Sequence, residues 1–263
     1  MTVAALAVWG TIGFRARHSV TATSSISATT NTSDSTSPVK PLATPATSPT
    51  TAATSAESSK AIPFAFDGPV DQNGLPKPWE ARIIVGKLQS EVVTETSGQK
   101  SLRIKCDKSH FVVWCKTAPI DPDKFPIIGW WWEAQALPPK GDSRTHTATP
   151  LLGDYRNDKG LQLMVGFDGD LVLNYVWDSN APIGYEFDER SPVATIKTQV
   201  IDSGPPTPGK RQHRIDVRAD FLRRFGKPPG KILGVGISAN TNHTAAQSDG
   251  TVGDIRLLPA NSR

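Results

Sequence analysis

From Ala61 onward, short runs alternate between apolar and polar residues, and Gly, Pro, Asn and Asp separate these runs. Alternation with a period of two is typical of strands with one buried face, and frequent turn residues favour an all-β fold, an antiparallel β-sandwich. The pattern predicts strands at Ala81–Val85, Ser90–Thr96, Ser101–Cys106, Phe111–Lys116, Ile127–Leu137, Leu161–Phe167, Asp170–Trp177, Ala194–Ile201, His213–Val217, Ile232–Ser238 and Val252–Leu257.

One segment has a helical pattern instead. In Arg218–Phe225, the apolar residues Phe221, Leu222 and Phe225 form one stripe, and Gly226 stands where a C-terminal cap belongs. We expect one short helix that covers an edge of the sandwich.

Two short turn sequences predict tight strand pairs. The FDGD sequence at Phe167–Asp170 should join two neighbouring strands near the centre of a sheet, and DKSH at Asp107–His110 should form a second hairpin. The second hairpin places Trp114 on its outer face opposite Arg103, where a cation-π pair is expected.

The same hairpin sets the chemistry of the two cysteines. In its register the sulfurs of Cys106 and Cys115 lie roughly 13 Å apart along the ladder, about twice the span of a disulfide. Both should be free thiols in the core. The residues that share their face are all apolar: Leu102, Ile104, Phe111 and Val113.

Three consecutive tryptophans lie in the strand that begins at Ile127. Alternation places Trp130 and Trp132 toward the core and Trp131 on the opposite side with Glu133. Across the central strands, that opposite side predicts one mixed polar face, composed of Trp131, Glu133, Gln135, Gln162, Met164, Asn174 and Ser238.

Two interpretations of this polar face stay open: a solvated sheet surface and a ligand-binding concavity. An exposed aromatic such as Trp131 needs either a ligand or a covering loop. In the ligand-binding interpretation, Trp131 stacks on a sugar, and Glu133, Gln162 and Asn174 donate or accept hydrogen bonds at its edge.

Catalysis has a weaker basis. The polar loop between Pro138 and Gly160 carries Asp142, Arg144, His146 and Asp154, which are suited to acid–base chemistry. No spacing of the HExxH kind and no nucleophile elbow supports an active site, so the catalytic residues stay unassigned and a surface loop is the simpler interpretation.

Metal binding is not predicted. His213 and His243 have no second histidine nearby, which is typical of surface residues. Asp67 and Asp254 are candidates for a structural calcium ion, but capping of turns explains them equally well. We therefore assign no metal and no cofactor.

The N-terminal part of the chain has a different composition. An apolar leader in residues 1–19 lacks the basic residues that precede a signal-peptide core, and it is too short for a membrane span. It is interpreted as the remnant of an export signal or anchor, an atypical signal, or an incidental apolar start. Residues 20–60 are rich in Ser, Thr, Ala and Pro, which predicts a disordered linker before a sandwich domain at 61–259. We expect a periplasmic or extracellular protein, with or without a membrane anchor. In the alternative interpretation, the Ser/Thr-rich segment is simply a poorly ordered leader.

The charge of the chain excludes only one class of function. The net charge is +4, and basic residues cluster only at Lys210–Arg214 and Arg223–Arg224, which argues against nucleic-acid binding. The expected contact with a membrane is limited to the N-terminal anchor.

Several blocks occur in an order that resembles the bacterial family called domain of unknown function 3047 (DUF3047). These blocks are IPFAFDG, GLPKPW, SLRIKC, IDPDKFPIIGWWWEAQALPPKGD, LNYVWDSNAPIG, DFLRRFGKPPGKILGVGISANTNHT and VGDIRLL. The resemblance implies a secreted or periplasmic β-sandwich without an established activity. The layout, with FDG near the start and GDI near the end, also resembles galactose-binding-like carbohydrate modules, which implies a sandwich of jelly-roll form. The chain departs from the family pattern at Trp131, where a basic residue is usual, and at Asn157, Asp158 and Gln162.

These observations predict a non-catalytic module that binds a saccharide or another cell-envelope polymer. Two alternatives remain: a hydrolase or lyase that acts on an envelope polysaccharide, and a structural envelope protein that binds a protein partner.

Overall fold

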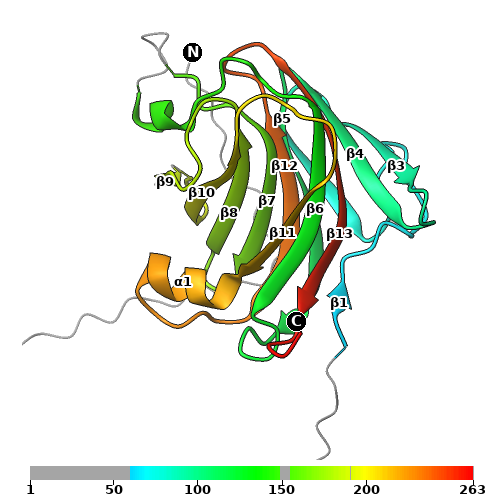
Figure 1. Cartoon of the computed structure of the whole chain (residues 1–263), viewed down its shortest axis with the longest axis vertical. Coiled ribbons are helices and arrows are strands. Elements are labelled where there is room, and N and C mark those ends of the chain that lie inside the picture. Colours follow the sequence, from blue (N-terminus) through cyan, green and yellow to red (C-terminus); the bar gives the residue numbers. More distant parts are fainter. Residues whose placement is uncertain (1–59, 149–154, 190, 263) are drawn as a thin grey trace, which may run out of the picture. The chain divides into compact units, whose positions relative to one another are not determined.

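A computed structural model describes residues 60–148, 155–189 and 191–262 of the chain. The described residues form two β-sheets that pack face to face, with one α-helix (Figure 1). The prediction of an all-β sandwich with one short helix is confirmed.

The smaller sheet has six strands in the order β11-β6-β13-β4-β3, with β1 added beside β13. All of its strand pairs are antiparallel. Its strands are β1 (Ile62–Pro63), β3 (Gln89–Thr94), β4 (Lys100–Asp107), β6 (Ile127–Ala136), β11 (Arg211–Asp216) and β13 (Gln247–Leu258).

The larger sheet has seven strands in the order β2-β5-β12-β7-β8-β10-β9. Its strands are β2 (Trp79–Val85), β5 (His110–Ile120), β7 (Lys159–Phe167), β8 (Leu171–Asp178), β9 (Glu186–Glu189), β10 (Thr195–Ser203) and β12 (Ile232–Asn240). The strand β10 inserts between β8 and β9, and it therefore runs parallel to β8. Every predicted strand is present, whereas β1 and β9 were not predicted.

The core lies between the two sheets and follows the predicted alternation. Trp130 and Trp132 of β6 are 2% and 0% exposed, and Tyr175 and Trp177 face them from β8. The FDGD turn joins β7 to β8 at the centre of the larger sheet as predicted, with Gly169 at a positive φ of 73°.

The second predicted hairpin is wrong. β4 pairs with β3 and β13 in the smaller sheet, whereas β5 pairs with β2 and β12 in the larger one, so the chain crosses between sheets at Asp107–His110. Cys106 and Cys115 are still buried free thiols. The expected pair of Trp114 with Arg103 does not form, because β4 and β5 belong to different sheets, and Arg103 instead binds Asp249 at 2.8 Å.

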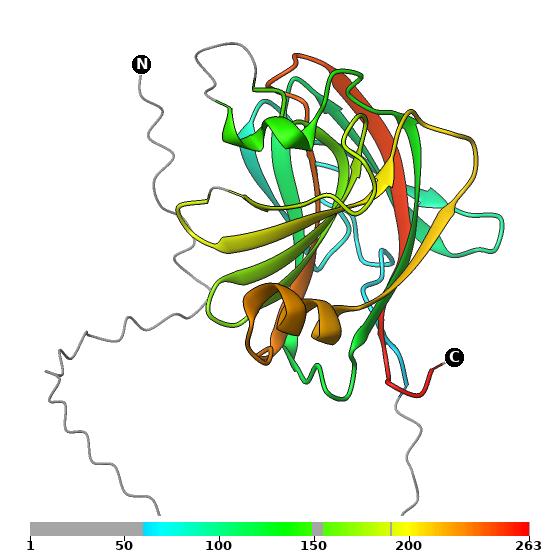
Figure 2. The same cartoon turned by 60° about the vertical axis from the view of Figure 1, so that its left-hand side comes forward.

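The helix α1 (Val217–Phe225) lies at one end of the two layers (Figures 1 and 2). Asp216 caps its first turn by accepting from Ala219 N, and Gly226 ends it in the left-handed conformation. Phe221 packs on Phe167 in the core, but Leu222 is 47% exposed and does not belong to the buried stripe. Within the described residues, no helix is both long enough and apolar enough to cross a membrane.

Candidate functional site

The outward face of the seven-stranded sheet carries a continuous row of side chains. Trp114 of β5 is paired with Gly236 of β12, Gly236 with Met164 of β7, Met164 with Asn174 of β8, and Asn174 with Thr198 of β10. Because side chains alternate between the two faces of a strand, all of these positions point away from the core. The row spans about 14 Å from Trp114 to Asn174 at normal strand spacing.

Trp114 lies flat on this face because glycines form the surface beneath it. A Cβ at Gly236 would lie 2.4 Å from Trp114 Cε3, and a Cβ at Gly166 would lie 2.7 Å from Cη2. A Cβ at Gly234 would lie 2.9 Å from the indole nitrogen. One side of the ring is thus pressed against the backbone of two strands, and the partly exposed ring presents its other side outward. We call Trp114, Met164 and these glycines the Trp114 floor.

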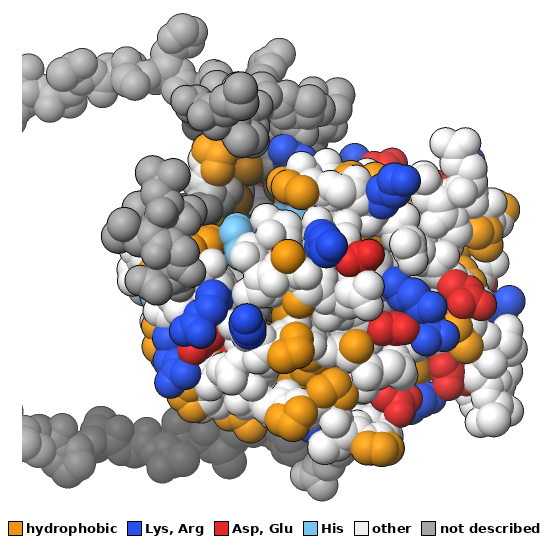
Figure 3. Space-filling model, turned by 90° about the horizontal axis from the view of Figure 1, so that it is seen from above, with side chains coloured by type: hydrophobic (Ala, Val, Ile, Leu, Met, Phe, Trp, Pro, Cys, Tyr) orange, Lys and Arg blue, Asp and Glu red, His pale blue; other side chains and the backbone are white. Residues whose placement is uncertain are grey.

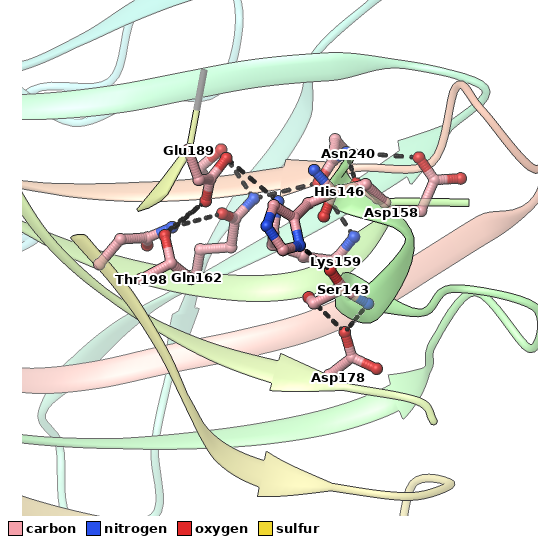
Figure 4. Close-up of polar contacts among 12 residues, drawn as sticks. Ser143, His146, Asp158, Lys159, Gln162, Asp178, Glu189, Thr198 and Asn240 are labelled. Carbon is pink, nitrogen blue, oxygen red and sulfur yellow. Dashed lines mark hydrogen bonds and ion pairs between the residues drawn. The ribbon is translucent and has the colours of Figure 1, made fainter. Parts of the chain in front are cut away.

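Beside the floor, buried amide side chains form a hydrogen-bonded ladder across the strands. Asn174 Nδ2 donates to Gln162 Oε1 at 2.9 Å, and Gln162 Nε2 donates to Asn240 Oδ1 at 3.2 Å. Asn240 Nδ2 then donates to Asp158 Oδ1 at 3.3 Å. Figure 4 shows the ladder running from Asp158 through Asn240 and Gln162 toward Thr198 and Glu189. Each amide is oriented by its neighbours, so the ladder fixes this half of the face.

A buried ion pair joins the ladder at its end. Lys159 Nζ lies 3.2 Å from Glu189 Oε2, and the two side chains are 3% and 18% exposed. Glu189 Oε1 also accepts from Thr198 Oγ1 at 2.6 Å and from Asn174 Nδ2 at 3.0 Å.

Glu189 is held in its ionised form by these partners. Burial raises the pKa of this carboxyl, but the charge of Lys159 and hydrogen bonds from Thr198, Lys159 and Asn174 outweigh burial, so the net shift is downward. The polar edge of the site therefore contains a carboxylate at neutral pH.

His110 of β5 lies on the same face, where it is paired with Asn240 of β12. Burial lowers its pKa to about 4, and the nearby charge of Lys159 acts in the same direction. His110 is consequently a neutral imidazole at neutral pH.

Two aspartates anchor the loops at this edge. Asp158 is fully buried and accepts from the backbone and side chains of His243 and Thr244, and these bonds outweigh burial to lower its pKa. Asp178 accepts from Ser143 N and Oγ at 2.8 and 2.5 Å, which holds the short helix η1 (Ser143–Thr147). Both carboxylates therefore hold loops in place.

The four predicted ligand-binding residues do not share one face. Gln162 and Asn174 belong to the larger sheet and contact each other, whereas Trp131 and Glu133 lie on the outward face of the smaller sheet. The alternation was correct in each strand, but the assumption that these strands form one sheet was wrong.

A loop covers Trp131. Lys210 Nζ lies 3.8 Å from the ring centroid, the backbone of Gly253 lies beneath the ring, and the residue is 5% exposed. Glu133 accepts from Gly209 N in the same loop. These contacts explain both residues without a ligand.

The loop proposed for catalysis is also occupied by internal contacts. Asp142 caps η1 and pairs with Arg144 at 2.8 Å, while His146 packs on Phe187 with a centroid distance of 4.5 Å. Asp154 lies outside the described residues. The described part of the loop therefore covers one edge of the outward face.

The other candidates have structural partners. His213 contacts Asp202, which also accepts from Trp132 Nε1 at 2.6 Å. Asp254 pairs with Arg256. No group of three or more His, Cys, Asp or Glu side chains in the described part of the chain is arranged to hold a metal ion.

Trp114 was the residue that sequence reasoning missed as a binding candidate. A usable signal was present, because Gly234 and Gly236 alternate along one strand and Gly166 lies in another. Glycines at alternate positions leave a stretch of one strand face without side chains, which makes room for a flat ring.

A family model described as "Protein of unknown function (DUF3047)" matches residues 77–256, and the chain belongs to this family. The family resemblance stated from the sequence is confirmed. No curated protein matches the sequence.

Three solved structures have a similar outline. They are an exo-beta-agarase (12% identity, 78% of this chain and 25% of that chain, TM-score 0.37), a loop-swap mutant of Necallimastix patriciarum Xyn11A (12%, 74% and 96%, 0.34) and a beta-1,2-glucanase from Parabacteroides distasonis (11%, 77% and 26%, 0.38). The chain spans about a quarter of the agarase and the glucanase. At these TM-scores the similarity carries no information on function.

Proposed function

We propose that the protein is a non-catalytic saccharide-binding module whose ligand stacks on Trp114. The observation that carries this proposal is the partly exposed indole ring that lies flat on Gly166, Gly234 and Gly236, beside a polar edge with an ionised carboxylate.

A sugar ring has the matching shape and chemistry. Its C–H face packs against an aromatic ring, while its hydroxyl groups point outward at the edge. On this sheet, Met164 of the floor is paired with Asn174 on the neighbouring strand, and the carboxylate of Glu189 lies 3.0 Å from Asn174 Nδ2. A short oligosaccharide that lies across the strands would contact the floor and the partly exposed carboxylate of Glu189.

The placement of carboxylates favours binding over hydrolysis. Glycosidases of the usual kind flank the scissile bond with two carboxyl groups roughly 5–9.5 Å apart. Among the described residues that line the floor, two carboxylates come into question: Glu189, which contacts Asn174 of β8, and Glu80 of β2, which is paired with Trp114. Between β2 and β8 there are four strand spacings, so Glu80 and Asn174 are separated by about 19 Å.

The proposal includes presentation of the module outside the cytoplasm. What supports this part is the composition of residues 20–60, which suits a tether that holds a domain away from a membrane. Its saccharide would then be a polymer of the cell envelope or its surroundings.

The test is a titration of the full chain with hexasaccharides of glucan, xylan, mannan and chitin. Isothermal titration calorimetry and tryptophan emission detect the binding. We expect saturable binding to at least one glycan and loss of that binding in Trp114→Ala. Release of shortened products during the titration would instead support the hydrolase or lyase alternative. Absence of binding throughout would contradict saccharide recognition.

A further inference from the structure

The charged groups around the Trp114 floor occur in compensated pairs. Lys159 is matched by Glu189 at one edge, and Glu80 lies 3.2 Å from Lys116 at the other. Arg82, on the neighbouring row, has an interaction partner of its own. Figure 3 shows acidic side chains beside several of the basic ones on the face seen from above. At these two edges of the floor, the basic groups Lys159 and Lys116 are therefore paired with carboxylates.

The accessible acceptor of the polar edge is the carboxylate of Glu189, whose side chain is 18% exposed. Asn174 is 1% exposed, so it lies beneath the surface, where its Nδ2 faces Gln162, Glu189 and Thr198 and orients this carboxylate. An ionised carboxylate can only accept. A ligand group that bonds to Glu189 must therefore donate a hydrogen bond, as a hydroxyl does.

A carboxylate on the ligand would fit this edge poorly. It would bring a second negative charge and two more acceptors toward Glu189, and Lys159 is already neutralised by Glu189. An unpaired acceptor in a site of low dielectric constant is costly, and so is a pair of like charges.

We infer, on the basis of the saccharide binding proposed above, that this site takes neutral, hydroxyl-bearing glycans and rejects glycans with carboxylates on the sugar rings. The discrimination comes from the pairing of Lys159 with Glu189. Without Glu189, the positive charge of Lys159 beneath this edge would be uncompensated and would attract acidic sugars.

Hexasaccharides that differ only in oxidation at C6 test this inference. The full chain is titrated with cellohexaose and mannohexaose and with the corresponding uronic acid hexamers at low salt. We expect the neutral member of a pair to bind at least tenfold more tightly, with an affinity that does not change with salt. Equal or tighter binding of the acidic member overturns the inference but leaves saccharide binding intact. If no hexamer of either kind binds, the inference fails, and the titration with xylan and chitin hexasaccharides decides separately whether saccharide binding fails as well.

Two variants locate the source of the discrimination. Glu189→Gln keeps the side-chain volume and leaves Lys159 uncompensated, so the ratio of acidic to neutral affinity should rise about tenfold and fall again with added salt. The double variant Glu189→Gln with Lys159→Met removes both charges and should restore the original ratio. An unchanged ratio in the folded single variant contradicts the assignment. The comparison of hexamers on the unmodified chain remains decisive if either variant fails to fold.

Discussion

Trp114 lies directly on Gly236, so closely that a Cβ atom at this glycine would lie 2.4 Å from Cε3 of the indole ring. The two residues are paired across β5 and β12, and the glycine leaves the space that the ring fills. The orientation of the ring, and with it the binding floor, therefore depends on a residue that has no side chain.

Replacing this glycine should tilt the ring away from the sheet. For Gly236→Ala we expect a loss of about 1–3 kcal/mol in the free energy of unfolding, because the added methyl group overpacks the contact. Glycan affinity should fall as well. Urea unfolding and calorimetric titration measure the two effects.

Gly129 provides the matched control for that variant. It is also a buried glycine within a strand, but a Cβ atom added there would have Leu258 Cδ1 as its nearest neighbour at 3.4 Å, an ordinary contact. Gly129→Ala should leave glycan affinity unchanged. Equal loss of affinity in the two variants would show that the floor has no special role.

As the pH is lowered, His110 should reduce the free energy of unfolding before the carboxylates of the protein become protonated. The pKa of His110 is about 4 in the folded protein, against about 6.5 in an unfolded chain. Below pH 6.5 the unfolded state takes up the proton first, so stability falls as the pH decreases toward 4. Between pH 7 and pH 5 this amounts to about 2 kcal/mol.

His110→Asn isolates that contribution, because the asparagine does not titrate. The difference in unfolding free energy between the variant and the unmodified chain should change by about 2 kcal/mol over the same pH interval. A difference that stays constant from pH 7 to pH 5 would mean that His110 titrates normally in the folded protein.

The two cysteines should not react in the folded protein. Cys106 and Cys115 are 1% and 4% exposed, and burial raises the pKa of each thiol to about 11. Because the thiolate is the reactive form, a disulfide reagent such as DTNB should label neither thiol at pH 8 and both in denaturant. Fast labelling without denaturant would contradict the packing of these strands.

Much of the sandwich could be predicted from alternation, because burial on one face imposes a period of two wherever a strand forms. Trp130 and Trp132 were placed in the core for this reason, and both are buried. The same signal cannot identify the strand's neighbours. Cys106 and Phe111 both face the core, but they do so from opposite sheets rather than from one hairpin.

The candidate site was less accessible to sequence reasoning for the same physical reason. Trp131 and Trp114 both follow strand alternation onto an outward face, and both lie on glycines. What distinguishes them is the loop that brings Lys210 over Trp131, a contact between segments that are far apart in the chain. Gln162 and Asn174 were correctly placed together, since a tight turn fixes the register of their two strands.

The central claim is that Trp114, and not Trp131, is the binding surface, and paired alanine variants test it most directly. Trp131 is enclosed, so Trp131→Ala should cost about 3–5 kcal/mol of stability and leave the affinity of the surviving folded protein unchanged. Trp114→Ala should lower the glycan affinity at least tenfold while the melting temperature changes little. Calorimetric titration and thermal unfolding of both variants give the answer. Binding that survives in Trp114→Ala but is lost in folded Trp131→Ala would contradict the account.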